Sequence, residues 1–345
     1  MTGEAKLPGI QRIAREGNFG REELWPHGHR FSGAHHLLQT VALARGTEVS
    51  GGSLACPNGV SSPTGVVLPN GLTRYPPAGT IWLIMASGER QGQLWSAAPR
   101  DWAELQEPFC RPLWQATLQV LGVKPGVRLL DAGCGAGGAS VLATALGGEV
   151  TGIDACAALL AIARERLPQA WFIHGDLEQL PFAAGQFHAA LAANSVIFAE
   201  DIRLALRELR RVVQPGGRVA ITSWGRPEQC EMREVFAAVA SVLPQRPPGG
   251  GPFAWSADGA LAELLSGAGM KVMAEGGSQC DFHYPDFAAF WRAQTSAGNY
   301  QPALLAVGPE RLRQVVGEAL RPYTRADGAI VLRNIYGWAV GQVVP

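Results

Sequence analysis

Short apolar runs alternate with helical patterns through the middle of the chain. These runs are Val127–Asp131, Glu149–Asp154, Trp171–His174, His188–Ala193 and Gly217–Trp224. Each has the length of a strand, and the segments between them space their apolar residues as helices do. Because strands that alternate with helices usually form a parallel sheet with crossover helices, the pattern predicts an α/β fold.

Helical patterns flank this alternation on both sides. Upstream, apolar residues from Trp102 to Leu121 recur at helical spacing until Pro125-Gly126 breaks the pattern. Downstream, two further strands are expected at Lys271–Ala274 and Ile330–Val340, with helical stretches between them. We therefore expect a helical cover inserted before the last strand.

In the first 84 residues the apolar positions show neither the alternation typical of a strand nor the spacing typical of a helix, and glycine and proline are frequent. The second methionine, Met85, precedes a polar segment that resembles the start of a globular domain. Residues 1–84 are interpreted as a poorly ordered extension, with the hypothesis that the native protein starts at Met85. Residues 85–345 are expected to form one domain, with a core at 125–224 and a cover at about 225–325.

Composition narrows the class of partner. The chain has 29 Lys plus Arg and 29 Asp plus Glu, which gives no general attraction to nucleic acid or to an anionic membrane. Its six cysteines have no paired spacing that would indicate disulfides or zinc, and no apolar run is long enough to cross a membrane. We expect a cytoplasmic protein that binds a small molecule, without a metal, and the oligomeric state stays open.

A glycine loop follows the first of the five strands. Gly133, Gly135 and Gly138 lie between this strand and a helix, where missing Cβ atoms allow a ligand close to the backbone. Asp154 ends the second strand, where a carboxylate can accept hydrogen bonds from ribose hydroxyls. Nicotinamide cofactors and S-adenosylmethionine both fit these features.

Two further carboxylates separate the two cofactors. Asp131 stands directly before the glycine turn, where a dinucleotide site normally keeps an apolar residue and leaves room for pyrophosphate. A negative charge there suits the sulfonium and ammonium groups of S-adenosylmethionine. Asp176, in the sequence Gly175-Asp176-Leu177 after the third strand, is placed to accept from an adenine amino group. The pattern favours the methyl donor.

With these motifs the chain resembles the class I S-adenosylmethionine-dependent methyltransferases, in the small-molecule branch with a type 11 domain that is similar to ubiquinone and menaquinone biosynthesis methyltransferases. The resemblance rests on residues 129–135, 150–154, 175–182 and 210–217, and covers about Trp95 to Val340. It implies a Rossmann-like, seven-stranded and mostly parallel sheet with an antiparallel last strand and helices on both faces. The cofactor-binding residues that it implies are Asp131, Gly133, Cys134, Gly135, Asp154, Ala155, Asp176, Leu177 and Asn194.

Methyl transfer by direct displacement needs no fixed catalytic side chain, because positioning and desolvation supply much of the rate. If the acceptor needs a general base, the candidates in the cover are His283, Tyr284 and Tyr300. The acceptor and the methylated atom, whether oxygen, nitrogen or carbon, stay open. The alternatives are an NAD(P)-dependent oxidoreductase with the same glycine loop and a non-catalytic S-adenosylmethionine-binding domain.

Overall fold

The computed structural model describes residues 66–67, 73–74, 87–243 and 251–345. The chain divides into two units, Met1–Pro77 and Ala78–Pro345. In the first unit, β1 (Val66–Val67) pairs antiparallel with β2 (Thr73–Arg74). The other residues of 1–84 lie outside the described part, so the expectations for that segment, and the hypothesis of a start at Met85, stay predictions.

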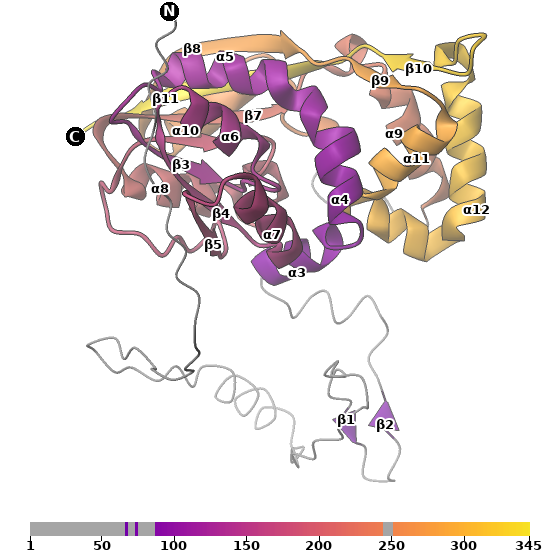
Figure 1. Ribbon diagram of the computed structural model, residues 1–345, viewed down its shortest axis with the longest axis horizontal. Coiled ribbons are helices and arrows are strands. Elements are labelled where there is room, and N and C mark those ends of the chain that lie inside the picture. The colour runs from indigo at the N-terminus through magenta and orange to yellow at the C-terminus, as the bar shows by residue number, and fades with distance from the viewer. Residues whose placement is uncertain (1–65, 68–72, 75–86, 244–250) are drawn as a thin grey trace, which may run out of the picture. The chain divides into compact units, whose positions relative to one another are not determined.

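The second unit is built on a seven-stranded sheet with the strand order β5-β4-β3-β6-β7-β11-β8 (Figure 1). Its strands are β3 (Arg128–Ala132), β4 (Glu149–Asp154), β5 (Trp171–His174), β6 (Phe187–Ala192), β7 (Val213–Trp224), β8 (Met270–Gln279) and β11 (Ile335–Val343). Neighbours from β5 to β7 pair in parallel, whereas β11 pairs antiparallel with both β7 and β8. The predicted mostly parallel sheet with an antiparallel last strand is confirmed.

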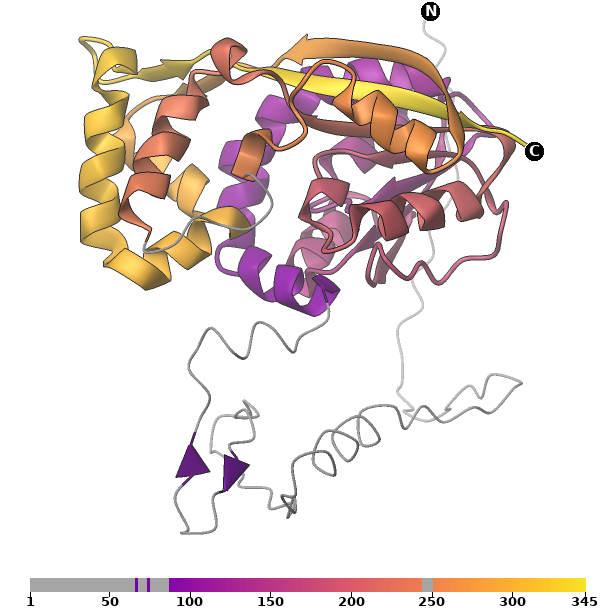
Figure 2. The ribbon, with the colours of Figure 1, turned by 180° about the vertical axis from the view of Figure 1, so that it is seen from behind.

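Helices cover both faces because the inner strands are apolar on both sides. Leu129 of β3 packs in one core cluster with α5 (Arg111–Leu121) and α6 (Gly138–Ala145). Leu130 belongs to the opposite cluster, with α8 (Ile202–Val212) and α10 (Ala260–Gly267), the two helices in front of the sheet in Figure 2. Between β4 and β5 the chain forms α7 (Ala157–Arg166).

The predicted cover is formed by α9 (Met232–Val242), α11 (Phe287–Thr295) and α12 (Gln301–Leu320), which lie together in Figure 1. Helix α12 bends at Gly308, whose φ is 76°, directly before Pro309. The range 225–325 also supplies β8 to the main sheet. None of the described helices combines the length and the apolar character that crossing a membrane requires.

Two predicted elements differ from the structure. The single strand expected at Ile330–Val340 is wrong, because β10 (Ile330–Leu332) pairs with β9 (Phe282–Tyr284) in a separate sheet, and β11 begins only at Ile335. Buried Asn334 lies at the break and accepts a hydrogen bond from the amide of Met232. Sequence periodicity does not register such a change of partner, because both segments are apolar.

The other difference is the expected continuous helix from Trp102 to Leu121. The chain instead passes through α4 (Pro99–Asp101), a π-helical turn (Trp102–Gln106) and a 3-10 turn (Glu107–Cys110) before α5. A further helix, α3 (Ser87–Trp95), precedes them and was not expected. Residues of α3 and of these irregular turns line the main pocket of the domain.

Candidate functional site

The site is a pocket at the carboxyl ends of the parallel strands, where ligands bind in open α/β sheets. Each of the five strands β3 to β7 contributes a residue at its end or just after it. These residues are Gly133, Asp154, Gly175, Asn194 and Trp224. Helix α3 and the irregular turns at 102–110 add further lining residues from the N-terminal side.

The glycine loop after β3 approaches neighbouring strands closely. Gly133 has a φ of 74°, and a Cβ atom built on it would lie 2.2 Å from the Cβ atom of Ser195, after β6. Gly135 has a φ of 54°, and its amide donates to the Asp154 carboxylate at 2.8 Å. Glycine is thus required at Gly133 both for its backbone angle and for space.

The carboxylate of Asp154 holds the loop and the next helix together. One oxygen accepts from the amide of Gly135 at 2.8 Å, and the other accepts from the amide of Cys156, the N-cap of α7, at 2.7 Å. Burial raises the pKa of Asp154, while these amide hydrogen bonds counteract the rise. Each carboxylate oxygen has two acceptor sites, so the side chain retains capacity for ligand hydroxyls.

Asp131 lies in β3, two residues before Gly133 of the loop, and is 2% exposed. Its carboxylate accepts a hydrogen bond from the hydroxyl of Ser140 at 2.6 Å. Burial raises the pKa of Asp131 to about 7, an effect to which the nearby carboxylates of Glu107 and Asp154 add. A bound cation near this group would offset the cost of its negative charge.

Asp176 lies at the other end of the pocket, after β5. Its carboxylate accepts from the amide of Glu178 at 2.9 Å and from the amide of Gly88 in α3 at 2.7 Å. Leu177 and Ala155 also line the pocket, together with Cys134. The structure therefore brings these predicted cofactor residues to one cavity.

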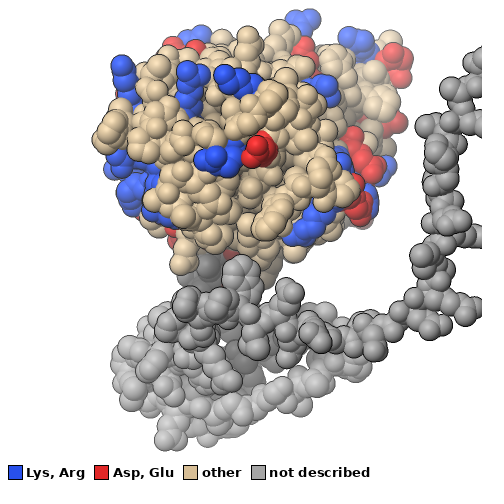
Figure 3. Space-filling view, turned by 60° about the vertical axis from the view of Figure 1, so that its left-hand side comes forward, with Lys and Arg blue, Asp and Glu red and all other residues tan. Residues whose placement is uncertain are grey.

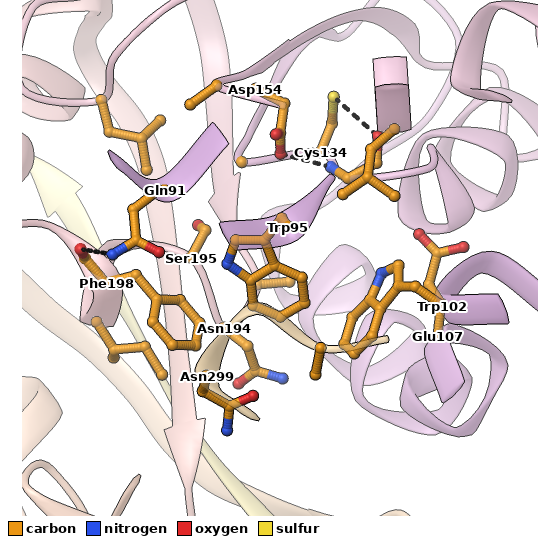
Figure 4. A pocket seen from close by; sticks show the side chains of 18 of the residues that line it. Gln91, Trp95, Trp102, Glu107, Cys134, Asp154, Asn194, Ser195, Phe198 and Asn299 are labelled. Atoms are coloured by element: carbon orange, nitrogen blue, oxygen red, sulfur yellow. Dashed lines mark hydrogen bonds between the residues drawn. The ribbon is translucent and has the colours of Figure 1, made fainter. Parts of the chain in front are cut away.

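Asn194 also lines the pocket and has a φ of 53°, an uncommon conformation for a residue other than glycine. Two hydrogen bonds to Thr222 of β7 fix Asn194. The Thr222 hydroxyl donates to the Asn194 side-chain oxygen and accepts from the Asn194 backbone N–H, each at 2.8 Å. The side-chain nitrogen of Asn194 lies near Asn299 in Figure 4 and donates a long hydrogen bond to the Cys110 sulfur at 3.9 Å.

The three candidate bases do not line the pocket. His283 is exposed on β9, and Tyr284 is buried with its hydroxyl donating to Gln106. The Tyr300 hydroxyl is buried without a partner among the described residues. Burial raises the pKa of both tyrosines, so neither is available as a phenolate at neutral pH. The two tyrosines are thus packed inside the cover, whereas His283 is exposed to solvent.

The sequence did not indicate that α3 closes over the pocket. The Gln91 side chain donates to the Phe198 carbonyl at 3.2 Å, and the Trp95 ring packs edge-on against Phe198 and Trp102 (Figure 4). The spacing of Gly88, Gln91 and Trp95 is helical and was the available signal. Three helically spaced residues were too few to distinguish a helix that lines the site from an ordinary polar segment at the start of a domain.

Gly92 determines how closely α3 approaches the site. A Cβ atom there would lie 2.2 Å from the carbonyl oxygen of Ala155. We expect Gly92→Ala to displace α3 and to lower the affinity for the ligand of this pocket, although alanine favours helices by about 1 kcal/mol. Faster hydrogen exchange of residues 87–95 would report the displacement. Gly267→Ala in α10, with nothing within 4 Å of the added atom, is the matched control and should keep wild-type affinity; equal behaviour of the two variants would contradict the assignment.

The charges of the pocket have one sign. Its charged lining residues are the carboxylates Glu107, Asp131, Asp154 and Asp176, and no Lys, Arg or His occurs among the described residues that line it. Ionised carboxylates around a cavity favour a cation and disfavour an anion, and a bound cation in turn favours their ionised form. No group of three or more His, Cys, Asp or Glu side chains in the described part of the chain is arranged to hold a metal.

The sheet order defines an α/β domain, and a glycine loop and carboxylates after successive strands line its pocket. Residues 130–221 match the protein family described as a methyltransferase domain. This part of the chain is therefore similar to a methyltransferase domain.

Curated relatives match part of the chain. A 2-phytyl-1,4-naphtoquinone methyltransferase of Synechocystis is 40% identical over 128 residues, covering 33% of this chain and 52% of the relative. A malonyl-acyl carrier protein O-methyltransferase of Erwinia pyrifoliae is 35% identical over 146 residues, covering 42% and 56%. The chain thus spans about half the length of the curated relatives it matches.

Solved structures are similar at lower identity. A SAM-dependent methyltransferase of Aquifex aeolicus is 16% identical, with a TM-score of 0.43 over 71% of this chain and 98% of that chain. The cyclase SpnF is 21% identical, with a TM-score of 0.46 over 67% of this chain and 80% of that chain.

Proposed function

We propose that this protein transfers a methyl group from S-adenosylmethionine to a small-molecule acceptor by direct displacement. The observation that carries the proposal is a pocket with four carboxylates and no basic side chain among its described lining residues. S-adenosylmethionine brings a sulfonium and an ammonium group, which this charge favours. The pyrophosphate of NAD(P) would be repelled at the same place, which disfavours the oxidoreductase alternative.

We assign the residues of the pocket to the successive parts of the cofactor. Asp176 and Leu177 are assigned to the adenine end, and Asp154 with Ala155 to the ribose. Gly133, Cys134 and Gly135, with Asp131 below them and Asn194 opposite, are assigned to the methionine end. The glycine at position 135 supports this assignment. A side chain there would occupy the space that a ligand needs between Glu107 and Trp102.

The far end of the pocket is suited to an apolar acceptor. Trp224 of β7 packs edge-on against Phe236 of α9 at 5.1 Å and lies 4.4 Å from the ring of Tyr336 on β11, measured between ring centroids. Aromatic walls of this kind bind flat, apolar molecules. The cavity is continuous from the carboxylates to these rings, which favours an enzyme over a non-catalytic binding domain.

Among the described residues that line the acceptor end, no side chain is suited to act as a base. Burial raises the pKa of the Cys110 thiol and of the Tyr336 hydroxyl, so both stay protonated at neutral pH. The cofactor would supply an activated methyl group, and the residues here would position the acceptor and exclude water. An acceptor that brings its own nucleophile fits this arrangement.

The surface adds support for a small acceptor. On the face shown in Figure 3, Lys and Arg side chains are dispersed among uncharged residues and do not form one continuous strip. Nucleic-acid binding normally uses a concentrated basic surface. This face is therefore better suited to contact with solvent than with a polyanion.

Isothermal titration calorimetry tests the proposal directly. We expect S-adenosylmethionine and S-adenosylhomocysteine to bind and NAD to give no heat of binding. Tight binding of NAD with no response to either sulfur compound would overturn the proposal. Formation of S-adenosylhomocysteine during a screen of acceptor molecules would then identify the substrate.

A further inference from the structure

Glu107 is the one buried pocket carboxylate among the described residues that lies neither in the glycine loop nor at the end of a strand. It lies in the 3-10 turn before α5, is 5% exposed and lines the pocket. The π-helical turn directly before it changes the helical phase, so Gln106 and Glu107 are both buried although they are consecutive. Irregular turns of this kind inside helices often mark functional sites.

Arg166 at the end of α7 holds this carboxylate. Its guanidinium donates to Glu107, to the Ala136 carbonyl at 2.9 Å and to the Ala103 carbonyl at 2.7 Å. Arg166 is not among the residues that line the pocket. The arginine is therefore fixed behind Glu107, and the carboxylate stands between it and the cavity.

One oxygen of Glu107 has spare capacity toward the glycine loop. It accepts from the amide of Gly138 at 3.3 Å, a long hydrogen bond, and lies 3.5 Å from where a Cβ atom on Gly135 would be. In Figure 4, Glu107 lies beside Trp102, with Cys134 between it and Asp154 in this view. Glu107 is thus at the methionine end of the assigned cofactor site, opposite the ribose end.

We propose that Glu107 binds the ammonium group of the amino-acid part of the cofactor, with Arg166 as the residue that positions its carboxylate. This inference rests on the proposed function. The carboxylate has one cationic partner, Arg166, and the backbone amides of Gly138 and Ala136 also interact with it. Two carboxylate oxygens offer about four acceptor sites, so at least one is left for an ammonium group, which has three donors. Desolvation raises the pKa of Glu107 despite Arg166, so a second cation beside it would favour its charged form.

Two ligands that differ in the amino-acid part test this role. S-adenosylhomocysteine carries the ammonium group, whereas 5′-methylthioadenosine keeps the nucleoside and the sulfur but lacks the amino acid. For Glu107→Gln we expect calorimetry to show an affinity for S-adenosylhomocysteine that is lower by about 10- to 100-fold, as for the loss of a charged hydrogen bond. The affinity for 5′-methylthioadenosine should stay at the wild-type value.

A control comes from a neighbouring ion pair that also involves α7. Arg100 of α4 and Glu165 of α7 form an exposed ion pair at 2.7 Å outside the pocket. Glu165→Gln removes a carboxylate from a similar helix contact and should leave both affinities unchanged. Equal weakening of the two ligands by Glu107→Gln would assign Glu107 a purely structural role, and no weakening of either would also overturn the proposal.

The outcomes separate this inference from the function on which it rests. If neither ligand binds the wild-type protein, the proposed function fails; if both bind but Glu107→Gln does not discriminate, only the role of Glu107 fails. If Glu107→Gln does not fold, as judged by circular dichroism, Glu107→Asp keeps the charge but withdraws it from the cavity. That variant should lose affinity selectively for S-adenosylhomocysteine, and equal loss for both ligands would refute the assignment.

Discussion

Alanine at position 133 is expected to destabilise the protein more than any other single methyl group added to the glycine loop. The residue has a φ of 74°, which costs a non-glycine residue about 1–3 kcal/mol. In addition, the new Cβ atom would lie 2.2 Å from the Cβ atom of Ser195, so β3 and β6 would have to separate. Overpacking of this kind adds about 1–3 kcal/mol, and the sum is a large part of the stability of a typical domain.

Urea denaturation followed by circular dichroism measures this effect, and two variants separate its causes. Gly216 also has a positive φ, 81°, but no atom lies within 4 Å of a Cβ built on it. Gly216→Ala should therefore lower the free energy of unfolding by only about 1 kcal/mol. Adding Ser195→Gly to Gly133→Ala removes the clashing atom and should recover the steric part. If Gly133→Ala is no worse than Gly216→Ala, the close approach of the two loops is not as described.

The second large effect is expected at Asp154, in binding. Asp154→Ala removes the carboxylate assigned to the ribose and leaves the amides of Gly135 and Cys156 without their acceptor. A hydrogen bond to a charged group contributes about 1.5–3 kcal/mol. Losing the two that the ribose hydroxyls would donate to Asp154 should therefore weaken S-adenosylhomocysteine binding by about 100-fold or more. Calorimetry at constant pH and salt measures this change.

A ligand pair distinguishes the direct role of Asp154 from its role in holding the loop. The wild-type protein should prefer adenosine to 2′,3′-dideoxyadenosine, and Asp154→Ala should bind both equally weakly. Asp154→Asn keeps one oxygen acceptor and should fold normally with an intermediate preference. A variant that still discriminates between the two nucleosides would show that the ribose is recognised elsewhere.

Several predictions from the sequence agree with the structure for a simple topological reason. Parallel strands place their carboxyl ends at one edge of a sheet, so residues that follow successive strands converge even when they are far apart in the chain. Asp131, Asp154 and Asp176 could therefore be assigned to one cavity from strand pattern alone. The glycine positions were also readable locally, because a strand-to-helix turn restricts the backbone there.

The sequence was less informative for the N-terminal helices and for the cover. Trp102 to Leu121 has continuous helical periodicity, yet the π and 3-10 turns change the phase and bring Glu107 into the pocket. His283, Tyr284 and Tyr300 have suitable chemistry for bases, but none lines the pocket: the two tyrosines are buried in the cover, and His283 is exposed on β9. Residue type indicates what a side chain can do, whereas its surroundings decide what it contacts.

The amino-acid sequence by itself determined the α/β class, the mostly parallel sheet and the carboxylates that follow its strands, since each depends on local pattern and on a short rule of topology. Only the tertiary structure decided that α3 closes over the site, that Arg166 fixes Glu107 beside the glycine loop, and that the last apolar segment divides between two sheets. Those features depend on contacts between residues that are far apart in the chain. Hydrophobic periodicity records which face of an element is buried, but it does not specify the partner against which that face packs.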